Sequence, residues 1–86
     1  MPRRQSIREL VVELIRSYYK ERGRDTFSYN DLRRFYYGAY PREKRFADWH
    51  SIERILRLLA SEGLLFRHYP SPRKVLFIIS PALVRR

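Results

Sequence analysis

Four polar side chains recur along one side of a predicted helix over residues 49–62, namely His50, Arg54, Arg57 and Ser61. At about 100° per residue, they fall within roughly 60° of one another. A guanidinium donates two parallel hydrogen bonds that fit guanine edges or phosphate oxygens, and a helix of this width fits the major groove of DNA. The row, with Ser51 beside it, therefore predicts contact with bases or phosphates. For a charged row alone, however, a solvent-exposed helix face is the commoner explanation.

The opposite side of the same segment is apolar. Residues with helical spacing form this stripe, namely Trp49, Ile52, Ile55, Leu56 and Leu59. We expect Asp48 to cap the first turn and Gly63 to end the helix in the left-handed conformation. Trp49 is predicted to belong to the core, and a stacking surface is the alternative.

The composition is strongly basic. The 86 residues include 19 Lys or Arg against 9 Asp or Glu, which gives a formal net charge of +10. Because self-repulsion of this size costs stability, such a charge usually serves an acidic partner, most often nucleic acid, with an anionic membrane as the main rival. Cysteine is absent, which excludes disulfides and thiolate metal sites. The few thermolabile residues and many charges suggest a thermophilic host.

Two further helices carry start signals. Ser6 and Glu9 form the pattern of a capping box before an apolar stripe that runs from Ile7 to Tyr18, and Gly23 is expected to end this helix. Its polar face contains several glutamates, which weakens a membrane-surface role. A second capping pattern at residues 28–31 predicts a helix over 29–38, with Leu32, Phe35, Tyr36 and Ala39 facing inward.

The remaining apolar segments are predicted to be strands. Residues 25–29 form a short strand, and residues 64–69 and 75–79 flank a tip at 70–74, which indicates a β-hairpin. Arg67 at the base of the hairpin, with His68, and Arg73 and Lys74 at its tip are candidates for contact with a phosphate strand or a minor groove.

Basic residues also gather around the second helix. Arg33 and Arg34 are expected to face outward with Tyr37, which suits a phosphate backbone and equally suits plain solvent exposure. The loop over residues 38–47 adds Arg42, Lys44 and Arg45 as candidate phosphate contacts. Phe46 is expected to anchor this loop to the core.

The domain organisation is simple. We expect a basic arm over residues 1–5, one domain over 6–80 and a tail over 81–86. The arm is either a frayed terminus or a contact to nucleic acid. The strand at 75–79 is apolar on both faces, so Leu76 and Ile78 or their neighbours need a cover. Either the tail covers them or another subunit does. The apolar outer face therefore also suggests a dimer or a larger assembly.

The order helix, strand, helix, helix, hairpin resembles the winged helix-turn-helix superfamily of DNA-binding domains, including many small archaeal and viral transcription factors. The most specific segment runs from Ile55 to Phe66, followed by a basic turn and an apolar strand. The resemblance implies an α+β winged helix with three helices, a short strand and a C-terminal hairpin as its wing. Two features depart from the pattern, since the loop before the third helix is long and Trp49 is bulky.

No catalytic constellation is recognised, and no enzyme activity, cofactor or metal site is expected. His50 and His68 lack the spacing of a metal pair, and no glycine-rich phosphate loop is present. No stretch approaches the roughly 20 apolar residues of a membrane span, so we expect a cytoplasmic protein. We expect a regulator or architectural factor that binds duplex DNA. An RNA-binding, ribosome-associated role and a protein-interaction module in a nucleic-acid complex remain the alternatives.

Overall fold

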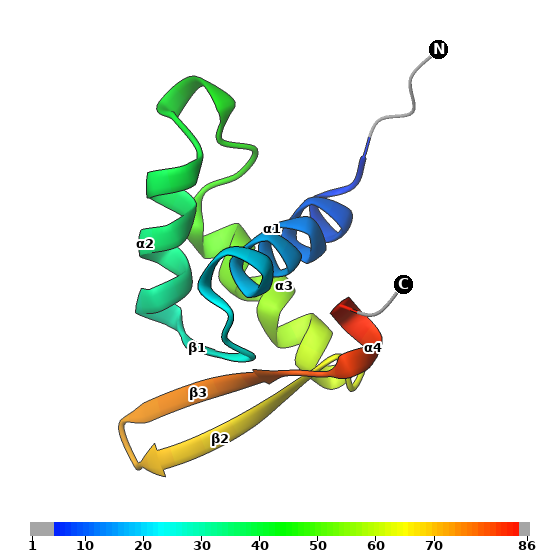
Figure 1. Cartoon of the computed structure of the whole chain (residues 1–86), viewed down its shortest axis with the longest axis vertical. Coiled ribbons are helices and arrows are strands. Elements are labelled where there is room, and N and C mark those ends of the chain that lie inside the picture. Colours follow the sequence, from blue (N-terminus) through cyan, green and yellow to red (C-terminus); the bar gives the residue numbers. More distant parts are fainter. Residues whose placement is uncertain (1–4, 85–86) are drawn as a thin grey trace.

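The computed structural model describes residues 5–84 (Figure 1). Along them the elements are α1 (Ile7–Arg22), β1 (Thr26–Ser28), α2 (Tyr29–Ala39), the 3₁₀ helix η1 (Arg42–Lys44), α3 (Trp49–Ser61), β2 (Leu65–Ser71), β3 (Lys74–Ile79) and α4 (Pro81–Val84). The predicted α+β class and the order of the longer elements are confirmed. Most of the predicted basic arm, including Arg3 and Arg4, lies outside the described residues, as do Arg85 and Arg86.

Reciprocal side-chain caps start two of the helices, as predicted. In α1 the Ser6 hydroxyl accepts from the Glu9 N–H at 3.1 Å, and the Glu9 carboxylate accepts from the Ser6 N–H at 3.0 Å. In α2, Ser28 and Asp31 make the same pair of bonds, both at 3.1 Å. Each box satisfies two N–H groups that would otherwise lack a partner at the start of a helix.

The three strands form one antiparallel sheet in the order β1-β3-β2. β3 is central, with Phe27 opposite Phe77 on one side and Arg67 opposite Phe77 on the other. The turn of the hairpin is tighter than predicted, because only Pro72 and Arg73 lie between the strands. The register of β2 with β3 shifts between His68 and Ser71, a stretch that contains Pro70.

The sheet has one buried and one open face. Phe27, Leu65, Phe77 and Ile79 point to the helices and are buried. On the other face Leu76 and Ile78 are half-buried, and their neighbour Phe66, opposite Ile78, is 49% exposed. The predicted apolar outer face is therefore present in the structure.

The core is built on α1 and is largely aromatic where α2 meets it. Tyr18 of α1 packs edge-on against Phe27 and Phe35, each with ring centroids 5.6 Å apart. Trp49 is 9% exposed and lies with the core, as predicted. The expectation that Ala39 faces inward is wrong, because Tyr40 and Phe46 pack on Tyr36 at this end of α2 and leave Ala39 exposed.

A compact turn joins α3 to β2. The Gly63 N–H donates to the Ala60 carbonyl at 3.1 Å, and the Leu64 N–H donates to the Leu59 carbonyl at 3.0 Å. Gly63 has φ of +80°, the left-handed conformation that this pair of bonds requires. The Leu64 carbonyl then accepts from the Ser80 N–H at 3.1 Å, which ties the turn to the end of β3.

The tail forms a short helix that the sequence did not indicate. Leu83 of α4 is buried, and its carbonyl accepts from Arg16 Nε of α1 at 2.8 Å. Four residues are too few for a periodic pattern, and this helix depends on its contact with α1. The tail thus packs against α1. No helix within residues 5–84 is both long and apolar enough to cross a bilayer.

Two glycines make a matched test of this geometry. Gly63→Ala should destabilise the protein by about 1–2 kcal/mol, because a Cβ disfavours the left-handed conformation. Gly38 lies inside α2 with nothing within 4 Å of a Cβ and no positive φ, so Gly38→Ala should stabilise by roughly 0.5–1 kcal/mol. Urea denaturation measures both changes, and equal effects would contradict the turn described here.

Candidate nucleic-acid interface

The polar row of α3 is exposed. His50, Arg54 and Arg57 are all solvent-accessible, whereas the stripe of Trp49, Ile52, Leu56 and Leu59 is buried. The Asp48 carboxylate accepts from the Ser51 N–H at 3.2 Å and caps the helix, as predicted. Hydrogen bonds from Ser51 hold the pKa of Asp48 below its usual range. Ser51 itself is half-buried at the flank of the row, where it lines a shallow depression with Ile7, Arg54, Ile55 and Leu58.

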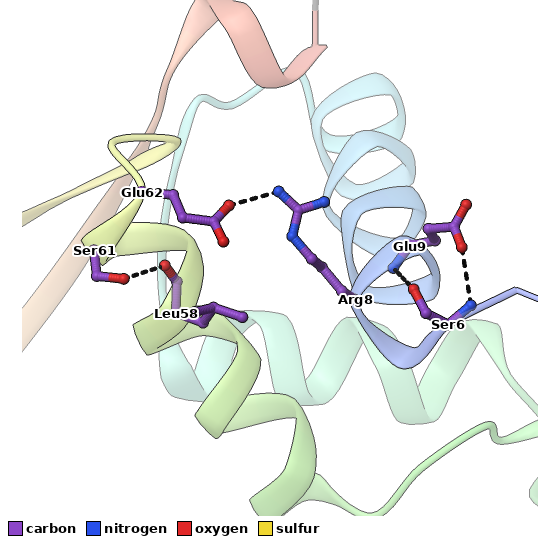
Figure 2. A network of polar contacts seen from close by, with 6 residues as sticks. All are labelled: Ser6, Arg8, Glu9, Leu58, Ser61 and Glu62. Atoms are coloured by element: carbon purple, nitrogen blue, oxygen red, sulfur yellow. Dashed lines mark hydrogen bonds and ion pairs between the residues drawn. The ribbon is translucent and has the colours of Figure 1, made fainter.

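The acidic and hydroxyl groups next to the row are already engaged. Glu62 accepts from Arg8 of α1 at 2.5 Å, and Ser61 donates to the Leu58 carbonyl at 2.6 Å (Figure 2). His50 Nδ1 lies 3.8 Å from the Glu53 carboxylate. Within residues 5–84, no carboxylate forms an ion pair with Arg54 or Arg57. The two arginines are therefore available to an external anion.

The hairpin divides its polar residues between two faces. Arg67 lies opposite Phe77 and so shares the face that turns toward the helices. His68 lies opposite Leu76 on the outer face, next to Phe66. Arg67 and His68, both predicted to lie at the base of the hairpin, therefore lie on opposite faces of the sheet, because successive strand residues point to opposite faces.

Tyr29, at the start of α2, brings the helix and the hairpin together. Its ring packs edge-on against Phe77 of β3, with centroids 5.1 Å apart. Burial raises the pKa of the Tyr29 hydroxyl, and the positive charges of Arg57 and Arg67 oppose that rise. Glu53 of α3 raises this pKa as burial does, so charges of both signs from α3 and a cation from β2 act on the same phenol.

The tip of the hairpin lies beside the first turn of α2. Arg73 and Lys74 line a hollow there together with Ser28, Tyr29, Asn30, Asp31 and Val75. Arg73 lies in the turn and Lys74 begins β3, and both are exposed. The basic tip and Arg67 are therefore both found next to Tyr29.

The loop between α2 and α3 uses one of its predicted contact residues internally. Arg45 Nε donates to the Tyr40 carbonyl at 3.1 Å, and its guanidinium carbon lies 4.5 Å from the centroid of the Tyr37 ring. Arg45 thereby satisfies a carbonyl at the end of α2. Arg42 and Lys44 lie exposed on η1. Phe46 is half-buried against Tyr36 and Tyr40 and anchors the loop, as predicted.

The adjacent arginines of α2 belong to different surroundings. The guanidinium carbon of Arg33 lies 5.6 Å from the centroid of the Tyr37 ring. Arg45 from the following loop packs on the same ring. Arg34 instead lines a hollow formed with the C-terminal end of α1. Both are exposed, but the structure does not place them at one common contact.

Two tyrosines near the interface were missed from the sequence. Tyr29 is half-buried between α3 and the hairpin, and Tyr69 is 60% exposed on β2. The two-residue alternation of a strand, which links Leu65, Arg67 and Tyr69, is the signal that identifies Tyr69. Tyr29 has no such signal, because its position depends on the contact with Phe77, distant in sequence.

Among residues 5–84, no group of three or more His, Asp or Glu side chains is placed to hold a metal ion. Comparisons of the chain with protein-family models, with curated proteins and with solved structures gave no match. Any inference about function is therefore based on the residues of this chain and their arrangement.

Titration of Tyr29 tests the convergence of α3 and β2. Because the nearby cations favour the phenolate, Arg57→Gln and Arg67→Gln should each raise the pKa of Tyr29 further. Tyrosine Cζ chemical shifts followed by NMR measure this pKa. Arg34→Gln, on the other flank of α2, is the charge-matched control and should leave it unchanged. An equal response to all three substitutions would contradict the convergence.

Alkaline pH gives a second test. Burial raises the pKa of Tyr18, Tyr29 and Tyr40 above the ordinary value. The folded state therefore holds these protons more tightly than the unfolded state, so their contribution is present below about pH 10 and is lost at higher pH. Denaturant midpoints measured from pH 8 to pH 11 should be level at first and then fall. A midpoint that rises above pH 10 would contradict the burial of these hydroxyls.

Proposed function

We propose that this chain is a winged-helix protein that binds duplex DNA, as a transcription regulator or an architectural factor. The observation that carries the proposal is that exposed arginines lie on both α3 and the hairpin. Arg54 and Arg57 are exposed on α3, and Arg67 of β2 lies opposite Phe77, the residue on which Tyr29 packs. When a helix and a hairpin present cations to a shared surface, the helix can lie in the major groove of DNA while the hairpin contacts the adjacent phosphate backbone.

The topology supports this assignment. A helix, a short strand, two helices and a hairpin follow one another, and the strands are ordered β1-β3-β2. In a winged helix this arrangement makes α3 the recognition helix and the β2-β3 hairpin the wing. The resemblance is one of architecture, so the function depends on the residues that the two elements present.

Charge supports a polyanionic partner. The net charge is +10, and within residues 5–84 the exposed arginines and lysines of the proposed interface have no carboxylate at ion-pair distance. Each cation placed on a phosphate releases condensed counterions, and this release favours binding at low salt. His50, Arg54 and Arg57 would contact bases or phosphates, while Arg67, Arg73 and Lys74 would contact the backbone.

The loop and α2 have two roles in this proposal. Arg42 and Lys44 would contact phosphates before α3, where the chain enters the recognition helix. Arg33 and Arg45 flank Tyr37, and Arg45 also holds the end of α2. Arg45 is therefore proposed to position the loop first and to offer its remaining donors to a phosphate second.

Substitutions in α3 test the proposal. Arg54→Gln and Arg57→Gln should each weaken duplex binding, and each should lower the slope of log affinity against log salt by about 1, because one phosphate contact is lost. Fluorescence anisotropy on a labelled duplex, measured at several salt concentrations, gives both quantities. Lys20→Gln removes the same charge from an exposed position on α1 and should change neither.

The same assay separates the alternatives. Structured RNA bound more tightly than duplex DNA, with the same loss in the α3 variants, would assign the surface to RNA. Affinity and slope unchanged by both substitutions would reject α3 as the nucleic-acid contact and favour a protein-interaction role. A flat salt dependence of the unsubstituted protein would reject nucleic-acid binding altogether.

A further inference from the structure

A second basic surface lies where the C-terminal end of α1 meets α2. A hollow there is lined by Tyr18, Arg22, Arg24, Asp31 and Arg34. None of these residues comes from α3 or from the β2-β3 hairpin. Asp31 also lines the hollow at the hairpin tip, so the two hollows meet at this residue. The cations differ, because Arg22, Arg24 and Arg34 line only the hollow at the end of α1.

The floor of the hollow is rigid. The Arg22 guanidinium carbon lies 5.5 Å from the centroid of the Phe35 ring, and that ring packs edge-on against Tyr18. The Tyr18 hydroxyl donates to the Thr26 carbonyl at 3.2 Å, which fixes its ring in turn. Because the guanidinium of Arg22 packs on the Phe35 ring, its side chain has fewer accessible rotamers, and binding an anion costs less side-chain entropy.

The three arginines of the hollow form no ion pair with a carboxylate of the described residues. Asp31 is the carboxylate among the lining residues, and it accepts from the Ser28 N–H at 3.1 Å as part of the cap of α2. Within residues 5–84, no carboxylate lies at ion-pair distance from Arg22, Arg24 or Arg34. Three guanidiniums around one concave surface reinforce one another's field, and each can fork onto phosphate oxygens.

The hollow and the polar row of α3 open on different surfaces. On α2, Phe35 contacts Tyr18 of α1, whereas Tyr36 contacts Trp49 of α3. Arg34 lies on the side of α2 that faces α1, where it lines the hollow. The row of α3 borders α1 at the N-terminal end of that helix, where Ser51 and Arg54 line a depression with Ile7, whereas the hollow lies at the C-terminal end of α1. Figure 1 shows α1 crossing in front of α3.

We propose that this hollow binds a backbone phosphate of a second nucleic-acid segment, so that one molecule bridges two duplexes. The inference rests on the proposed function for the first segment. The chemistry of the lining fits a phosphate, because it offers three guanidinium forks. It fits a passing backbone rather than a nucleotide, because Tyr18 is buried and no other aromatic side chain among the lining residues offers a base a stacking surface.

A capture experiment tests the bridge. The full chain is first bound to an immobilised duplex, a fluorescent second duplex is added, and the retained fluorescence is measured. The unsubstituted protein should retain the second duplex. Arg24→Gln and Arg34→Gln should each lower retention about tenfold, while direct binding to a single duplex changes less than about twofold. Lys20→Gln removes the same charge elsewhere on α1 and should leave both quantities unchanged. Thermal denaturation confirms that each variant is folded.

Several outcomes would overturn the bridge. No retention by the unsubstituted protein at saturation of the first duplex would do so. Retention that survives Arg24→Gln and Arg34→Gln would assign bridging to a dimer. An equal loss of direct binding would place the hollow on the first duplex. Inorganic phosphate that shifts the guanidinium Nε–H signals of Arg22, Arg24 and Arg34 without any duplex retention would assign the hollow to a small anion.

The two proposals can fail separately. Direct binding to a single duplex reports on Arg54 and Arg57 of α3, whereas retention of the second duplex reports on Arg24 and Arg34. Direct binding that is insensitive to the α3 substitutions, alongside retention that depends on the hollow, would reject the α3 interface and support the hollow as a phosphate site. The reverse result would leave α3 in place and reject the bridge.

Discussion

The backbone of Leu64 connects α3 to the hairpin, the two elements of the proposed interface. The Leu64 N–H donates to the Leu59 carbonyl at the end of α3, and the Leu64 carbonyl accepts from the Ser80 N–H, which follows β3. One residue thus belongs at once to the end of a helix and to the base of a hairpin. The flanking Leu59 and Leu65 are buried, so the turn is also fixed by packing on both sides. The positions of Arg57 and Arg67 around Tyr29 follow from this junction.

The sequence predicts most of the fold because its signals are local. The caps at Ser6, Ser28 and Asp48 and the stop at Gly63 each depend on residues within one or two turns. Buried and exposed sides of α3 also follow from periodicity alone. The short helix α4 escapes such reasoning, because four residues carry no period and Leu83 is held by contacts with α1.

The candidate site is predicted less completely, because its geometry depends on contacts between distant segments. Arg33 and Arg34 are neighbours in the chain, yet one lies over Tyr37 and the other lines the hollow at α1. Arg45 resembles a phosphate contact by type and position, but it donates to the end of α2. Tyr29 is placed by Phe77, almost fifty residues away, and no local pattern reports that contact.

The irregular outer strand of the sheet has a consequence for solubility. β2 lies at the edge of the sheet, contains Pro70 and changes register between His68 and Ser71. Proline offers no N–H, and the shift interrupts the even row of groups that an incoming strand would need. Tyr69, which is 60% exposed, lies within the irregular stretch, whereas Phe66, which is 49% exposed, lies in the regular part of the strand. An edge disrupted in this way offers a poor template for a strand from a second molecule.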